Sequence, residues 1–180
     1  MEYPLSDVRV IDCGQVIAGP LCACFMADLG AEVIKVEPPD GELFRPAEAT
    51  EEEYDGARTI DGEPFSPSFE LYNRNKRGLA LDLKRDRGRA VMYDLLDDAD
   101  VFVQNWPPGV ASRLGLGWET LRERNPDLVY AHITGYGETG PLAEYPGMDT
   151  IAQHISGFAS ILGYDDDRPP IRSQSSLADY

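Results

Sequence analysis

The first 36 residues constrain the fold most, because two apolar β-branched runs enclose a stretch with a helical repeat. The pieces, in chain order, are a strand at Val8 to Ile11, a helix starting near Pro20 with one apolar face formed by Leu21, Phe25 and Leu29, a stop at Gly30, and a strand at Glu32 to Val36. This order predicts a βαβ unit with parallel strands and a right-handed crossover.

The same alternation continues to about residue 133. After a Pro-, Gly- and acid-rich surface excursion from Glu37 to Phe69, we expect a strand at 79–83, a helix at 87–96, a strand at 101–104, helical stretches at 109–114 and 118–124, and a strand at 128–133. The sequence therefore predicts an α/β fold, a Rossmann-like open and mostly parallel sheet, with ligands at the carboxyl ends of its strands.

Charge narrows the classes of partner. The 180 residues carry 32 acidic and 16 basic side chains, a net charge of -16, and only Lys35, Lys76 and Lys84 are lysines. Nucleic acid is excluded as a partner because its phosphates require a basic surface. An acid-rich, lysine-poor surface suits a high-salt cytoplasm, where screening weakens self-repulsion, so we hypothesise a halophilic source.

No membrane span or signal peptide is visible, which predicts a cytoplasmic protein. The three cysteines, Cys13, Cys22 and Cys24, lack the partners of a zinc site, and we interpret them as reduced core thiols. We therefore expect no metal site.

Three segments could contact a ligand, and each has a simpler interpretation. The turn at 14–20 precedes a helix, but it matches neither the G-x-G-x-x-G pattern nor the P-loop pattern of phosphate-binding loops. It is therefore an anion-binding turn or a tight turn without a ligand. Only Glu37, at the position of a ribose-binding acid, leaves a dinucleotide site possible. The run Asn73 to Gly78 is a phosphate clamp or a solvated basic loop. The glycine-rich loop at 134–141 is a ligand contact or an ordinary turn.

Among the titratable residues, His132 and His154 fit structural roles. Asp149 and Asp179 stand among apolar and small residues, unlike the solvated acids at 165–167. Residue physics alone does not choose a catalytic carboxylate among 32 acids.

Taken together, the segments resemble family III CoA-transferases, the formyl-CoA transferase and carnitine CoA-transferase family, along nearly the whole chain. The matching stretches are 4–12, Ala18-Gly19-Pro20, the specific run from Ala27 to Glu37, 73–77, 81–83, 99–101, Asn105, Pro108-Gly109, Leu114-Gly115, 135–137, Gly140-Pro141, Asp149, Ala152-Gln153, Ser156-Gly157 and Ala178-Asp179-Tyr180.

The resemblance implies a large Rossmann-like domain and a small domain in an interlocked homodimer. Residues 1–180 would be the N-terminal part of the large domain, without the small domain or the C-terminal return segment. The implied activity is transfer of CoA between an acyl-CoA and a small carboxylic acid. Coenzyme A or acyl-CoA is then a substrate, and no tightly bound cofactor is implied.

Site residues also follow from the resemblance. Asp179 would be the nucleophile, passing through an aspartyl anhydride and an aspartyl-CoA thioester, and Gln15 would donate a hydrogen bond near the reacting centre. Contacts to CoA would come from the basic run and the glycine-rich loop, at Asn75, Lys76, Arg77 and Tyr136.

The sequence departs from the family's patterns in two places. Trp106-Pro107 replaces a Phe-Arg pair whose arginine contacts CoA in relatives. Met148 stands where racemases of the same superfamily have a histidine base, and a thioether takes no proton. An α-methylacyl-CoA racemase and an inactive truncated remnant are the alternatives.

Overall fold

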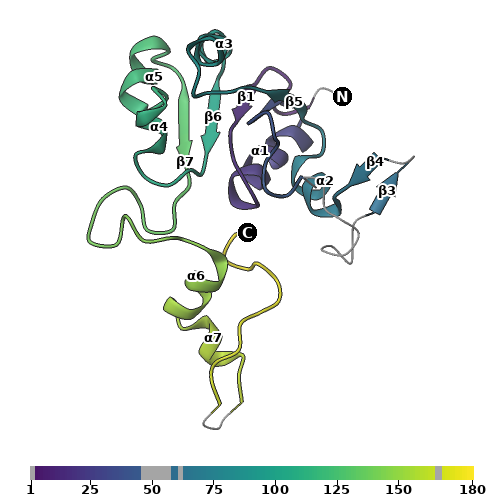
Figure 1. The fold of residues 1–180 in the computed structure, drawn as a ribbon, viewed down its shortest axis with the longest axis vertical. Helices are drawn as coiled ribbons and strands as arrows, with labels where there is room; N and C mark the ends of the chain where they lie inside the picture. Colours follow the sequence, from purple (N-terminus) through teal and green to yellow (C-terminus); the bar gives the residue numbers. More distant parts are fainter. Residues whose placement is uncertain (1–2, 46–57, 61–62, 165–167) are drawn as a thin grey trace.

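The computed structural model describes residues 3–45, 58–60, 63–164 and 168–180 as an α/β body with a protruding arm (Figure 1). The strands are β1 (Arg9–Asp12), β2 (Glu32–Glu37), β3 (Arg58–Ile60), β4 (Glu63–Phe65), β5 (Arg77–Ala80), β6 (Val101–Gln104) and β7 (Val129–His132). The helices are α1 (Ala18–Asp28), α2 (Pro67–Asn73), α3 (Asp86–Asp97), α4 (Val110–Arg113), α5 (Trp118–Arg124), α6 (Asp149–Ile155) and α7 (Phe158–Ile161).

The main sheet has five parallel strands in the order β5-β2-β1-β6-β7. The chain therefore fills one half of the sheet outward from β1 and then returns to fill the other half from β6. This confirms the predicted Rossmann-like sheet. It also places a topological switch point between β1 and β6, where the carboxyl ends of parallel strands form a crevice. The hairpin of β3 and β4 is antiparallel and separate.

Each face of the sheet has its own apolar cluster, because successive strand residues point to opposite faces. Ile11 and Phe102 pack with Met92, Leu96 and other side chains on the α3 to α5 side. On the other face, Val10, Val33 and Val103 pack with Ala23 and Ala27 of α1. The central strands β1, β2 and β6 thus form a buried layer between helices.

Helix α1 corrects one expectation. Leu21 is buried, but Phe25 is 56% exposed and Leu29 47% exposed. The helix turns its small side chains, such as Ala23 and Ala27, toward the sheet, which allows a close approach. Gly30, with φ of 100°, ends the helix as predicted. Among the cysteines, Cys13 and Cys24 are buried but Cys22 is exposed, so only two are core thiols.

Strand β5 begins two residues earlier than predicted. It pairs with β2 from Ile34 opposite Arg77 to Glu37 opposite Ala80. As an edge strand with mostly exposed side chains it has no apolar pattern, while Leu81 and Leu83, which suggested the strand, pack against the core beyond its end. The run at 73–78 therefore ends α2 and starts β5. The excursion at 37–69 contains β3, β4 and the start of α2, and its residues 46–57 and 61–62 lie outside the described part.

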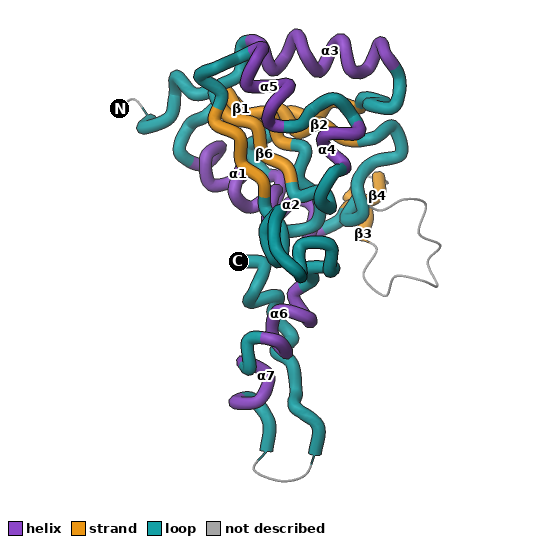
Figure 2. Tube along the Cα trace, turned by 90° about the vertical axis from the view of Figure 1, so that its left-hand side faces the viewer, coloured by secondary structure: helices purple, strands orange, loops and turns teal. Residues whose placement is uncertain are grey.

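After β7 the chain leaves the sheet, runs out through α6 and α7, and returns (Figures 1 and 2). We call residues 149–180 the arm. Its end meets α2, because the Tyr180 hydroxyl lies 2.8 Å from that of Tyr72. None of the helices in the described ranges is long and apolar enough to cross a bilayer.

Candidate active site at the sheet switch point

The turn after β1 and the residue after β6 are joined at the switch point. The Gln15 N–H donates to Asn105 Oδ1 at 2.7 Å, and Asn105 Nδ2 donates to Gln15 O at 2.8 Å. A side-chain amide thus pairs with a backbone amide like one strand with another. The pair fixes the Gln15 backbone and leaves its side chain exposed.

Val16, the next residue, has φ of 65°, a left-handed conformation that is strained for a β-branched side chain. Its N–H donates to Glu42 Oε2 at 3.0 Å, so the loop after β2 holds this turn from the other side. Glu42 is 5% exposed and its Oε1 has no partner among the described residues. The turn is therefore held in a strained shape by a buried carboxylate.

A buried cluster of charged side chains, Asp12, Lys35 and Lys76, also contacts this turn. Asp12 is fully buried; its Oδ1 accepts the Gly14 N–H, and its Oδ2 lies 2.8 Å from Lys76 Nζ and 3.8 Å from Lys35 Nζ. Lys76 also donates to Pro20 O at 2.7 Å and to Asn73 Oδ1 at 3.0 Å. Burial lowers the pKa of Lys76, and Asp12 opposes that shift. The cluster ties β1 to α1 and α2.

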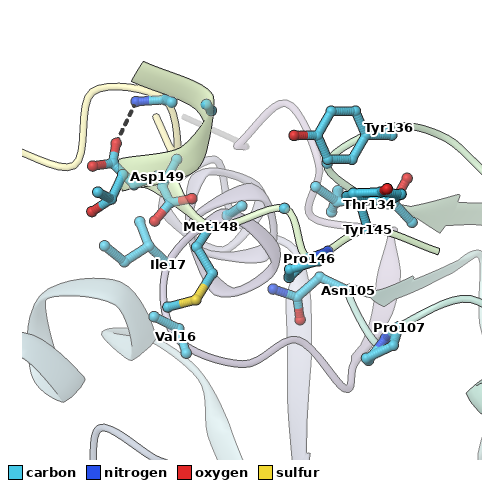
Figure 3. Close-up of a pocket in the computed structure, with 18 of the residues that line it drawn as sticks. Val16, Ile17, Asn105, Pro107, Thr134, Tyr136, Tyr145, Pro146, Met148 and Asp149 are labelled. Atoms are coloured by element: carbon cyan, nitrogen blue, oxygen red, sulfur yellow. Dashed lines mark hydrogen bonds between the residues drawn. The ribbon is translucent and has the colours of Figure 1, made fainter. Parts of the chain in front are cut away.

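A cleft of about 900 Å³ opens at the switch point. Its lining combines the turn after β1, the residues after β6 and β7, the approach to α6 and the end of the arm (Figure 3). The polar or charged side chains that line it are Asn105, Thr134, Tyr136, Glu144, Tyr145, Asp149, Thr150, Ser156, Arg172, Ser176 and Asp179.

Two glycines bring α6 close to the sheet. A Cβ on Gly135 would lie 2.3 Å from the Gly147 Cα, and a Cβ on Gly147 would lie 2.3 Å from the Gly135 Cα. Any side chain at either position would force the two segments apart. The loop after β7 therefore lies directly against the residues that lead into α6, and Met148 and Asp149 reach the cleft (Figure 3).

Two residues of α6 hold the returning segment of the arm through hydrogen bonds. Asp149 Oδ1 accepts the Ala178 N–H at 2.9 Å and its Oδ2 accepts Gln153 Nε2 at 2.7 Å. Gln153, 1% exposed, also donates to Ser175 O at 3.2 Å and accepts the Ser173 N–H at 2.7 Å. We call Asp149 and Gln153 the α6 clamp; it fixes the backbone just before Asp179.

Asp179 is half-buried in the cleft wall. Burial raises its pKa, and the negative charge of Asp149 raises it further. A carboxylate disfavoured in its ionised form is more reactive once ionised, since less hydration has to be removed. In the described part of the chain no three His, Cys, Asp or Glu side chains are grouped to hold a metal ion.

The predicted site residues fall into two groups. Asp179 and Tyr136 line one cleft, and Gln15 immediately precedes its wall. The basic run lies elsewhere. Asn75 Nδ2 donates to Asp28 Oδ1 at 2.9 Å and Arg77 Nη1 to Glu32 Oε1 at 2.6 Å, toward the amino end of β2.

Lys76 differs from its neighbours because its side chain is 1% exposed and is bound by three acceptors. The CoA contacts expected of this run stay predictions. His132 fits a structural role, with Nε2 3.0 Å from Trp106 O, and His154 is exposed on α6.

The sequence did not single out Glu42 or Arg172. Neither belongs to a local pattern: Glu42 is one of several acids in a loop, and Arg172 lies two residues after a Pro-Pro pair.

Comparison with known proteins matches residues 5–180 to CoA-transferase family III. A succinyl-CoA:mesaconate CoA-transferase of Haloarcula hispanica is 42% identical over 169 residues, covering 92% of this chain and 41% of that protein. A succinate–glutarate CoA-transferase of Agrobacterium fabrum is 40% identical over 177 residues, covering 98% and 43%.

The crystal structure of a CAIB/BAIF family protein from Brucella suis superposes with a TM-score of 0.89 at 34% identity, covering 99% of this chain and 46% of that one. The chain spans about two-fifths of the length of the two curated relatives. The match over nearly every residue, together with the shared fold, establishes that the chain belongs to CoA-transferase family III.

Proposed function

We propose that the protein transfers CoA between an acyl-CoA and a carboxylic acid, with Asp179 as the covalent nucleophile. The observation that carries this proposal is the position of Asp179: it lines the cleft at the switch point, half-buried, and its backbone is fixed by the α6 clamp. A weak nucleophile such as a carboxylate needs this kind of fixed placement.

The proposed reaction starts when an Asp179 carboxylate oxygen attacks the thioester carbonyl carbon. A C–O bond forms, the C–S bond breaks, and the electron pair leaves with sulfur as CoA thiolate. The thiolate then attacks the Asp179 carbonyl of the mixed anhydride, releasing the donor acid and leaving an aspartyl-CoA thioester. The acceptor carboxylate attacks that thioester, and the released thiolate finally takes the acceptor's acyl group from Asp179.

Each attack creates negative charge on a carbonyl oxygen, which needs nearby donors. Gln15 is the proposed side-chain donor, because its backbone is pinned by Asn105 while its amide remains exposed beside the cleft. Tyr136, half-buried in the lining, is the proposed contact for the CoA moiety. The relatives act on succinyl-CoA or on the CoA esters of other small acids by name, and we propose the same broad substrate class here.

The test is covalent capture in the intact protein. Incubation with acyl-CoA should give an adduct that hydroxylamine traps, and mass spectrometry should locate it on the peptide containing Ala178-Asp179-Tyr180. Asp179→Asn keeps the size of the side chain and removes the nucleophile, so CoA should still bind while adduct and transfer disappear. Robust transfer by this variant would refute the mechanism.

The same experiment addresses the racemase alternative. Met148 is 67% exposed and lines the cleft at the place where racemases carry a base, and its thioether cannot accept a proton. We therefore expect Met148→Ala to keep the chemical step. Exchange of the substrate's α-proton with solvent, without an adduct, would favour the racemase. The homodimer implied by the resemblance stays a prediction, which the mass of the intact protein in solution tests.

A further inference from the structure

The charges that line the cleft are unbalanced. Three acids, Glu144, Asp149 and Asp179, line it, and Arg172 is its one cation among the described residues. An anionic substrate entering this cleft meets mostly negative charge. It would need a cation close to its own carboxylate, because desolvating an unpaired anion is costly.

Arg172 is fixed at its backbone and open at its guanidinium. The adjacent Ser173 N–H is held by Gln153 Oε1 at 2.7 Å, so the α6 clamp fixes the chain beside the arginine. The guanidinium makes one long hydrogen bond, from Nη1 to Ser173 O at 3.4 Å. No carboxylate in the described ranges lies within 4 Å of it, whereas Arg45, Arg74 and Arg124 all have such partners.

We propose that Arg172 binds the distal carboxylate of a dicarboxylic substrate, the one that does not react. This inference rests on the function proposed above and adds a specificity-determining residue to it. A guanidinium matches a carboxylate in shape and charge, and it can bind both oxygens at once.

The chemistry distinguishes the distal carboxylate from the reacting one. The reacting carboxylate loses its charge when it becomes an anhydride or a thioester, so a permanent cation beside it would lose its partner during the cycle. The distal carboxylate stays ionised in every intermediate. A guanidinium on the segment that also carries Asp179 suits a group that is anionic throughout.

The experiment compares two thioesters with four-carbon acyl chains in the first half-reaction, adduct formation on the Asp179 peptide of the intact protein. Succinyl-CoA has the distal carboxylate, and butyryl-CoA has a methyl group in its place. For Arg172→Gln we expect the rate of adduct formation at low succinyl-CoA concentration to fall at least about tenfold, because about one charge-assisted hydrogen bond is lost. The rate with butyryl-CoA should change by less than about threefold. Arg172→Lys should recover part of the loss.

Arg168→Gln is the matched control. Arg168 is on the same arm and stacks on Tyr164 at 3.6 Å, and it does not line the cleft. It should leave both rates unchanged. Equal slowing of both thioesters by Arg172→Gln, or the same loss in Arg168→Gln, would overturn the inference while the proposed function stands. Absence of any adduct in the unmodified protein would refute the proposed function and this inference with it.

Discussion

The substitution Gln153→Met should release the segment that carries Asp179 without emptying the space that Gln153 fills. Methionine has a similar volume but no amide, so three hydrogen bonds of the α6 clamp disappear: those to Asp149, to Ser175 O and from the Ser173 N–H. One of these involves a carboxylate, and all lie at a side chain that is 1% exposed. After partial replacement by water, we expect a loss of about 3 kcal/mol in local stability.

Hydrogen exchange measures this loss directly. A change of 3 kcal/mol corresponds to about a hundredfold in the open population, so the Ser173 and Ala178 amides should exchange about a hundredfold faster, with β1 amides unaffected. The turnover of the intact protein should fall with them if Asp179 acts from this segment. Gln174→Met, the same change at an exposed neighbour, is the control. Unchanged exchange at Ser173 and Ala178 would show that the clamp does not hold the segment.

Three further predictions concern charge. Lys76→Met removes the nearer of the two lysines from the buried Asp12 and leaves Lys35, at 3.8 Å, as its remaining cation. The free energy of unfolding should therefore fall by about 3 kcal/mol in denaturant titrations, and a fall below about 1 kcal/mol would contradict the role assigned to the cluster. Burial and the charge of Asp149 raise the pKa of Asp179, so the reaction rate should begin to fall at a higher pH than it would for an exposed aspartate. Asp149→Asn should shift this acid limb of the pH–rate profile to lower pH. A limb that does not shift would exclude this coupling. With a net charge of -16, the unfolding midpoint should rise as KCl increases from millimolar to molar, and a flat response would count against the halophile hypothesis.

The parallel sheet could be predicted because its signals are local. The buried strand at 101–104 begins with three apolar residues in a row, and the prediction for it agrees with β6 residue for residue. Edge strand β5 lacks that signal, since solvent covers most of its side chains. The predicted buried face of α1 was wrong for a related reason. Hydrophobic periodicity detects large apolar side chains, whereas this helix packs on the sheet through alanines.

The site was less predictable because its contacts join distant residues. From the sequence, Lys76 was interpreted as a solvated or a phosphate-binding cation. Its partner, Asp12, is 64 residues away in sequence and is evident only in the folded chain. The left-handed conformation at Val16 could not be predicted, because this position has no glycine, the residue that usually signals such a conformation. It is held by a hydrogen bond to Glu42, 26 residues later. Asp179 was identified by resemblance, not by its surroundings.

Asp149 connects the geometry of the site to its electrostatics. Its carboxylate fixes the Ala178 N–H and so positions Asp179, the proposed nucleophile, but the same negative charge disfavours ionisation of Asp179. A neutral residue in its place would relieve that repulsion and weaken the clamp. Asp149 thus fixes the position of the arm's end and at the same time adds negative charge beside Asp179. Binding a dicarboxylate would add one more negative charge to a cleft that Glu144, Asp149 and Asp179 already line, so selection for a second carboxylate would depend on the proposed contact with Arg172.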